Sequence, residues 1–351
     1  MRLLTTTIGA YPKPKDAPVP MWTEIGGGRR QAPTEVYDAL VDNQNDEVRR
    51  ELDRLTIDAV GEQAACGIDI PTDGEIRREH YVYYHCRHLT GIDFRNLTDK
   101  AMRDGSWTAR VPTVRAALEA GEPFLPADWR VAQSATDHAV KITVPGPLTI
   151  SDSIADAHYG NRGDLARALA DVLNVEIRRL ADAGCKWIQI DEPLFARQID
   201  AALDFGIECL ERCFAVVPED VSRVVHICCG YPARLDDPDP AKANAHSYFT
   251  LAEAIDLAAV DAVSIEDAHR PNDLVLLEKF ARTKIILGLI NIADSRIEAV
   301  EALRERMLAA IEHIDADRLI AAPDCGLALM PRDLATAKLR NLSEAASDLP
   351  A

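Results

Sequence analysis

Short apolar runs alternate with longer segments of helical periodicity along the whole chain. A short apolar run bounded by turn residues is typical of a strand. The chain has eight such runs, at residues 3–9, 68–75, 139–147, 186–193, 223–230, 261–267, 284–291 and 318–326.

Between these runs, apolar residues recur every three or four positions, which indicates amphipathic helices. The longest pattern, 161–184, places Leu165, Leu169 and Leu173 on one face, and Gly184 suits its C-terminal cap. Three more long helices are predicted for residues 46–65, 294–315 and 331–347.

Eight strands that alternate with helices in 351 residues predict a (β/α)₈ TIM barrel. A doubly wound open sheet is disfavoured, because no G-x-G-x-x-G motif follows the first run. The segment 85–138, between strands 2 and 3, is too long for one crossover and is predicted to be an insertion with extra strands or a hairpin. We expect residues 1–351 to form a single catalytic barrel domain.

The amino-acid composition limits the kinds of molecule that the protein is expected to bind. The chain has 39 basic and 57 acidic residues, a net charge of −18, which disfavours nucleic acid and anionic membranes as partners. No apolar run approaches the ~20 residues of a membrane helix. The apolar stretch at the N-terminus is too short for a signal peptide, and Pro12 and Pro14 prevent its continuation. We expect a cytoplasmic protein, in which the eight cysteines are reduced and either pack in the core or bind metal.

Polar residues gather at the ends of the predicted strands. In a TIM barrel the C-terminal ends of the strands meet at one mouth, where the chemistry takes place. The residues in question are Asp73, Glu75, Asp191, Glu192, His226, Cys228, Glu266, Asp267, Asn291, Asp324 and Cys325.

The motif "HICC" supplies two candidate metal ligands. Residues two apart on a strand share a face, so His226 and Cys228 project together while Cys229 projects to the other side. A buried histidine beside packing cysteines is the alternative reading. Cys325 and Glu266 end neighbouring strands, and together the four residues form a set of donors that Zn²⁺ accepts. The cysteines expected to pack in the core are Cys66, Cys185, Cys209, Cys213 and Cys229.

Two thiolates make such a zinc site electron-rich, which suits binding of an incoming thiol better than activation of water. Glu75 and Asp191, on the opposite side of the mouth, are candidates for binding an ammonium group. Asp73 and Glu192 are alternatives for capping a helix N-terminus, and we expect that role for at least one member of each adjacent pair.

The ordered motifs "TTTIGAYPKP", "TDGE", "PGPLTI", "IDEP", "HICCG", "SIE" and "PDCGL" cover nearly the whole chain. Together they resemble the catalytic barrel of the cobalamin-independent methionine synthase family. The likeness is strongest to the short, folate-independent "core" members, which lack the N-terminal half of the longer enzymes.

The resemblance implies that zinc binds to His226, Cys228, Glu266 and Cys325. It also implies that homocysteine is held by the backbone of Ile8, Gly9 and Ala10 and by Glu75 and Asp191. The thiolate would then attack the methyl group of a donor in line, which gives methionine.

Three positions depart from the longer members of the family. Ala10 replaces a serine, residues 151–156 ("SDSIAD") lack a tryptophan that supports the folate ring, and 291–295 ("NIADS") lack a histidine. The last two, with the missing N-terminal half, argue against polyglutamyl methyl-folate as the donor. Methylcobalamin, a corrinoid protein or a methyl group delivered by a partner protein is expected instead.

Other functions are compatible with part of these observations. An epoxyalkane–coenzyme M transferase would use the same zinc with a different thiol, but its sulfonate would require Arg or Lys at the mouth. A zinc hydrolase is disfavoured by the two thiolates. A metal-free decarboxylase of the uroporphyrinogen type would leave the four-ligand set unexplained, and a binding protein with structural zinc would leave no open position for substrate.

Overall fold

Seven of the predicted strands form one parallel sheet, in the order β1-β10-β9-β8-β7-β6-β4. The computed structural model describes residues 1–21, 38–40, 42, 44–102, 107–237 and 242–349. The strands are β1 (Leu4–Thr5), β4 (Lys141–Pro145), β6 (Trp187–Asp191), β7 (Ser222–Ile227), β8 (Ala262–Ile265), β9 (Lys284–Ile290) and β10 (Leu319–Pro323). Each falls within or beside one of the apolar runs, as predicted.

The eighth predicted strand, at 68–75, is reduced to two bridges that close the barrel. Thr6 pairs with Ile70, and Thr72 pairs with Lys141. Ile70 N donates to Thr5 O at 3.0 Å, and Lys141 N donates to Pro71 O at 2.8 Å. Pro71 has no N–H to donate, which interrupts the ladder on this segment. The (β/α)₈ barrel is therefore confirmed, with one strand shorter than predicted.

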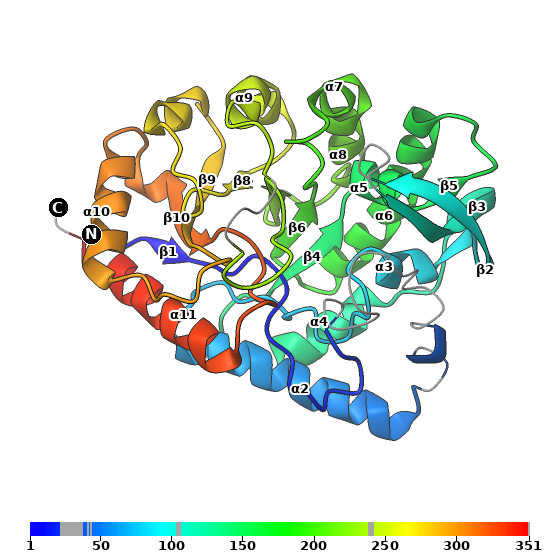
Figure 1. Ribbon diagram of the computed structural model, residues 1–351, viewed down its shortest axis with the longest axis horizontal. Coiled ribbons are helices and arrows are strands. Elements are labelled where there is room, and N and C mark those ends of the chain that lie inside the picture. Colours follow the sequence, from blue (N-terminus) through cyan, green and yellow to red (C-terminus); the bar gives the residue numbers. More distant parts are fainter. Residues whose placement is uncertain (22–37, 41, 43, 103–106, 238–241, 350–351) are drawn as a thin grey trace.

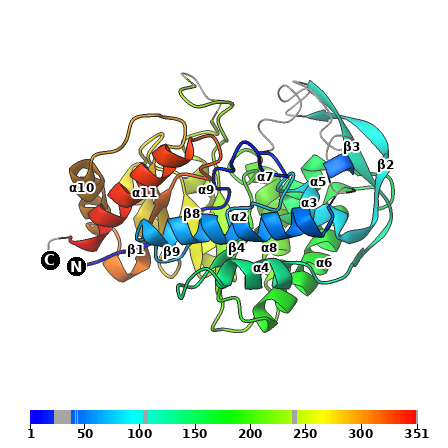
Figure 2. The same ribbon diagram turned by 90° about the horizontal axis from the view of Figure 1, so that it is seen from below.

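The long helices lie outside the barrel (Figures 1 and 2). Asn45 caps α2 by accepting hydrogen bonds from two backbone N–H groups of the first turn, and Asn161 caps α6. α10 begins later than predicted, since residues 294–299 form a loop. The α-helices are α2 (Asp46–Ala65), α3 (Tyr83–Arg87), α4 (Leu125–Gln133), α5 (Pro147–Ser153), α6 (Arg162–Asp182), α7 (Ile199–Ala201), α8 (Ile207–Cys213), α9 (Ser247–Leu257), α10 (Val300–Ile311) and α11 (Arg332–Ser347).

A long hairpin projects from the barrel between the second and third barrel strands (Figure 1). Its strands, β2 (Leu89–Met102) and β3 (Trp107–Ala120), are antiparallel, and the short β5 (Ala155–Asp156) pairs with β3. Residues 103–106, which join the two strands, lie outside the described residues. The assignment of residues 1–351 to a single catalytic domain stays a prediction.

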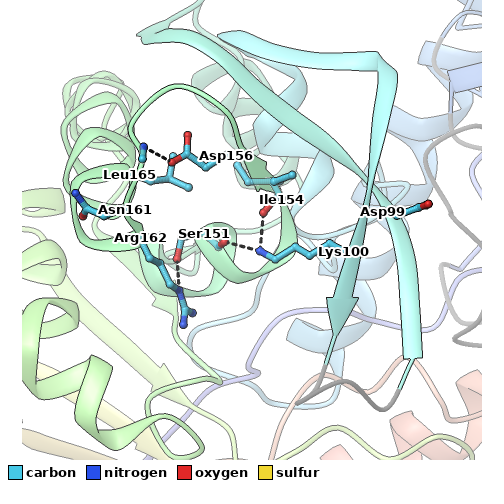
Figure 3. A pocket seen from close by; sticks show the side chains of 10 residues that line it. Asp99, Lys100, Ser151, Ile154, Asp156, Asn161, Arg162 and Leu165 are labelled. Atoms are coloured by element: carbon cyan, nitrogen blue, oxygen red, sulfur yellow. Dashed lines mark hydrogen bonds between the residues drawn. The ribbon is translucent and has the colours of Figure 1, made fainter.

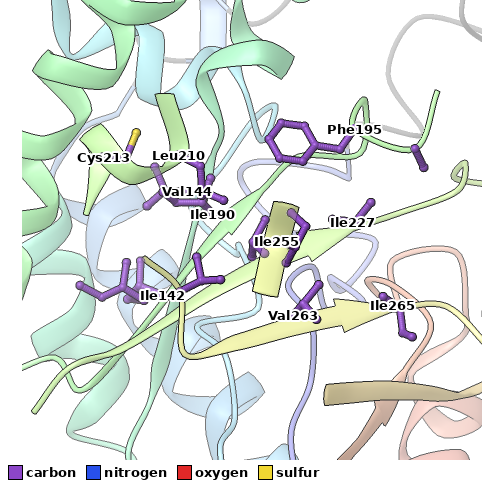
Figure 4. Close-up of a cluster of buried hydrophobic side chains, with 14 of the residues drawn as sticks. Ile142, Val144, Ile190, Phe195, Leu210, Cys213, Ile227, Ile255, Val263 and Ile265 are labelled. Carbon is purple, nitrogen blue, oxygen red and sulfur yellow. The ribbon is translucent and has the colours of Figure 1, made fainter. Parts of the chain in front are cut away.

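Alternation along the strands separates the packing residues from the functional ones. Val263 and Ile265 of β8 face outward and pack in the core between sheet and helices, together with Ile227 of β7 (Figure 4). Burying such a side chain contributes about 1.5–3 kcal/mol, so the outward faces hold the strands in place. The inward faces carry His226 and Ser264. The same inward faces also carry a second buried apolar cluster, which includes Val224, Ala262 and Ile286, so the polar groups lie toward the C-terminal ends of the strands.

Among the described residues, no helix has both the length and the apolar character needed to cross a bilayer.

Candidate functional site

His226, Cys228 and Cys325 come together at the mouth of the barrel. One ligand atom from each lies within 4.8 Å of the others. His226 Nε2 is 3.4 Å from Cys325 Sγ. For tetrahedral zinc with Zn–N of about 2.05 Å and Zn–S of about 2.3 Å, the N–S edge is about 3.6 Å. The three side chains therefore fit a zinc ion in their donor types and in this spacing.

Ser264 orients the histidine. β7 and β8 pair with His226 opposite Ser264, and His226 Nδ1 lies 2.9 Å from Ser264 Oγ. This contact directs Nε2 toward Cys325, which is the arrangement that a second residue commonly imposes on a metal-binding histidine.

Glu266 lies beside these three residues and outside their group. Its Oε1 accepts a hydrogen bond from Cys228 Sγ at 3.1 Å, and its Oε2 pairs with Lys242 Nζ at 2.8 Å. The set of four predicted from the sequence is thus three converging residues and an adjacent carboxylate. The role of Glu266 as the fourth ligand stays a prediction.

The two thiols differ in acidity. The close contact with the Cys228 thiol, together with the nearby His226, holds the pKa of Cys325 well below its usual range. The same contact, together with burial, raises the pKa of Cys228. Burial opposes a charge on His226, yet the combined effect of Cys325 and the neighbouring carboxylates raises its pKa.

Glu75 lies at the end of the bridge segment in an uncommon backbone conformation. Its φ is 55°, next to Gly74 at 68°, and non-glycine residues adopt this region at a cost of about 1–3 kcal/mol. Oε1 accepts hydrogen bonds from Thr143 Oγ1 at 2.8 Å and Arg78 at 3.3 Å. Burial raises the pKa of Glu75, and Arg78 opposes that shift. The turn thus places a buried carboxylate at the mouth.

Asp191 ends β6 beside the histidine. Gln189 donates to its Oδ1 at 2.7 Å and also to Ile8 O at 2.7 Å. Within the described part of the chain, Oδ2 accepts no hydrogen bond. Burial raises the pKa of Asp191 to about 7, with His226 opposing and Glu75 adding to the shift. A carboxylate oxygen to which no described residue donates is suited to receive a hydrogen bond from a ligand.

Ile8, Gly9 and Ala10 follow β1 and lie between these groups. A Cβ on Gly9 would come within 2.8 Å of Glu75 Oε1, and one on Gly326 within 3.1 Å of Ala10 N. The carbonyls are occupied, since Ala10 O accepts from Leu327 N at 2.7 Å. Gly9 O accepts from Thr72 and Ile8 O from Gln189. Among the described residues, their N–H groups donate to no protein acceptor.

The capping prediction for the adjacent carboxylates is correct for one pair and wrong for the other. Glu192 accepts from the N–H groups of Leu148 and Thr149 at 2.9 and 3.0 Å, at the start of α5. Asp73 instead accepts from Glu75 N at 3.1 Å within a turn that does not continue as a helix, and pairs with Arg78. Both residues therefore serve the structure around the site.

The cysteines expected to pack in the core do so, and all eight are free. Cys229 is 2% exposed and belongs to the core between sheet and helices, on the opposite side of β7 from Cys228. The expected residues are Cys66, Cys185, Cys209, Cys213 and Cys229, and Cys86, which was not among those predicted, packs there as well.

A hollow of about 370 Å³ lies apart from these residues, between the hairpin and the start of α6 (Figure 3). Lys100 Nζ donates to the carbonyls of Ser151 and Ile154, and Arg162 Nε donates to Ser151 Oγ. Both cations are therefore engaged by the protein itself, and we assign the hollow no ligand.

Sequence reasoning missed the residues that support the ligands and carboxylates. Ser264 and Gln189 each lie two positions before a predicted site residue, on the same strand face, and strand alternation would have found them. Arg78 lies three positions after Glu75 in the turn. Lys242 lies in a long loop, and nothing in its sequence surroundings indicates its role.

The fold and the site define a TIM-barrel enzyme whose mouth combines an imidazole, two thiols and buried carboxylates. The catalytic-domain model of the cobalamin-independent synthases matches residues 3–348. The chain therefore belongs to the cobalamin-independent methionine synthase family, whose members are methyltransferases of methionine biosynthesis.

Individual relatives agree with this assignment. The methionine synthase of Sulfolobus acidocaldarius is 30% identical over 342 residues, which cover 97% of this chain and 90% of that protein. The methionine synthase of Thermococcus kodakarensis is 29% identical over 342 residues, with coverage of 97% and 91%. The structure of a B12-independent methionine synthase from Shewanella sp., in complex with selenomethionine, superimposes with a TM-score of 0.83. It is 28% identical and covers 99% of this chain and 97% of that one.

Proposed function

We propose that the protein transfers a methyl group to the thiol of homocysteine and releases methionine. It holds zinc on His226, Cys228 and Cys325, with Glu266 as the fourth ligand. The observation that carries the proposal is the convergence of these three ligand atoms within 4.8 Å, at a mouth that also holds Glu75 and Asp191.

The donor set favours zinc and a thiol substrate. Two thiolates and an imidazole match zinc and make bound water a poor acid. When bound, zinc lowers the pKa of a coordinated thiol so that its sulfur is present as the thiolate. The sulfur then forms a bond to the methyl carbon as that carbon leaves its donor, and the bonding electron pair stays with the donor.

The remaining residues select an amino acid. Asp191 and Glu75 accept the ammonium group of homocysteine, since both are buried and Asp191 has an oxygen without a donor among the described residues. The N–H groups of Ile8, Gly9 and Ala10 bind its carboxylate. These contacts hold the substrate sulfur at a fixed position, which contributes to rate by orientation.

The mouth disfavours coenzyme M as the alternative thiol. Its sulfonate would approach the carboxylates of Glu75 and Asp191, and like charges at close range cost several kcal/mol when buried. Arg78 is already engaged by Asp73, Glu75 and Thr143.

The methyl donor is methylcobalamin, a corrinoid protein or a partner that delivers the group in the cytoplasm. The segments "SDSIAD" (151–156) and "NIADS" (291–295) support this part of the proposal, since they lack the tryptophan and histidine of folate-using members.

Zinc-loaded protein is expected to convert homocysteine to methionine with methylcobalamin as donor, and to leave coenzyme M unmethylated. The product is measured by mass spectrometry of a reaction with isotopically labelled methyl donor. Removal of zinc by a chelator abolishes the reaction, and zinc restores it. Methylation of coenzyme M in preference to homocysteine would contradict the proposal.

A further inference from the structure

Lys242 forms a buried ion pair with the proposed fourth ligand. Its Nζ lies 2.8 Å from Glu266 Oε2, and only 7% and 5% of the two side chains are exposed. Glu266 Oε1 is at the same time 3.1 Å from Cys228 Sγ. The carboxylate thus bridges a thiol of the candidate metal centre and a cation outside it.

The loop that carries Lys242 is tied to the strands on both sides. Ala243 N donates to Cys229 O at 2.7 Å, directly beside the "HICC" motif. Arg270, which follows β8, donates to Ala243 O at 2.8 Å. These contacts hold the ammonium group at a fixed place next to the end of β8.

The backbone around Glu266 is also fixed. Glu266 N donates to Tyr248 Oη at 3.0 Å. Asp324 accepts hydrogen bonds from the three following N–H groups, of Asp267, Ala268 and His269, at 2.7–2.9 Å. Movement of the carboxylate between Cys228 and Lys242 therefore requires only rotation of its side chain.

A carboxylate that leaves a metal inside a buried site needs another charged partner that stays beside it. Without one it becomes a buried unpaired charge, which is strongly unfavourable. Lys242 offers that partner at hydrogen-bond distance and makes a charge-assisted hydrogen bond with it.

We propose that Lys242 holds the Glu266 carboxylate when a substrate thiol replaces this carboxylate at the metal. Lys242 thereby sets how readily the coordination position of Glu266 becomes available. Lys242 is a positioning residue, since it acts through Glu266. The proposal deepens the proposed function and rests on zinc and a thiol substrate at this site.

The test compares Lys242→Met with Lys242→Arg, which keeps the cation, in the full-length zinc-loaded protein. Zinc affinity is measured by competition with a chelator, and homocysteine affinity by calorimetry. Lys242→Met is expected to bind zinc about tenfold more tightly and homocysteine at least about tenfold more weakly, the scale of one charge-assisted hydrogen bond. Lys242→Arg is expected to stay within about threefold of wild type in both, since it retains the charge.

The single variant Glu266→Gln and the double variant Lys242→Met/Glu266→Gln complete a double-mutant cycle with wild type and Lys242→Met. Once Glu266 has lost its charge, Lys242→Met is expected to change neither affinity by more than about twofold. Wild-type homocysteine affinity in Lys242→Met, or an effect of equal size in the Glu266→Gln background, would overturn the proposal. Wild-type protein that binds zinc and no homocysteine would refute the proposed function instead, and the zinc affinities of the four proteins would still decide whether Lys242 acts through Glu266.

Discussion

Cys325→Ala is expected to lose zinc and, with it, methyl transfer to homocysteine. The substitution removes one of three converging donors and the thiol whose pKa is held lowest among them. Loss of a residue that merely supports a ligand costs 10–100-fold in metal affinity, so loss of the ligand itself is expected to cost more than about a hundredfold. Zinc content after dialysis and the rate of methionine formation are the two measurements.

Cys229→Ala is the matched control, since Cys229 is also buried and lies next to a ligand in the same motif. It faces the core between sheet and helices, so its loss is expected to lower the free energy of unfolding by about 1 kcal/mol. Zinc content and activity are expected to stay at the wild-type level. Full zinc and full activity in Cys325→Ala would show that the ligand assignment is wrong.

Asp191→Asn is expected to raise the KM for homocysteine by about a hundredfold, because it removes one member of a buried charge pair with the substrate ammonium. Zinc content is expected to be unchanged, since Asp191 lies beside the ligands and is not one of them. The measurement is steady-state methyl transfer over a range of homocysteine concentrations.

A substrate that lacks the ammonium group shows whether a higher KM in Asp191→Asn comes from lost recognition of that group or from structural damage to the site. The KM for 4-mercaptobutyrate, which keeps the thiol and the carboxylate, is expected to be equal in wild type and Asp191→Asn. Glu192→Gln serves as the control variant, because Glu192 caps α5, and its ratio of the two KM values is expected to match wild type. An equal rise in KM for both thiols in Asp191→Asn would show that Asp191 does not read the ammonium group.

The barrel and the metal-binding strand face were predictable from local patterns. Alternation on the predicted strand 223–230 separated Cys228 from Cys229 correctly, although β7 itself ends one residue before Cys228. The weakness of the second strand was not predicted, although Pro71 cannot donate to a ladder. The pattern of apolar residues did not show how short that strand would be.

The residues that adjust the site depend on contacts between distant segments. Ser264 meets His226 only because β7 and β8 pair in that register. Lys242 reaches Glu266 from outside the described helices and strands, held there by Cys229 and Arg270. Such contacts arise from tertiary packing and leave no period or spacing in the sequence.

The number of sulfur atoms bound to zinc tests the central claim most directly. X-ray absorption at the zinc edge counts these atoms in the zinc-loaded protein with and without homocysteine. Two sulfurs, from Cys228 and Cys325, are expected in the protein alone, and three when homocysteine is bound, with one oxygen or nitrogen lost. A count that stays at two with saturating homocysteine would contradict that claim.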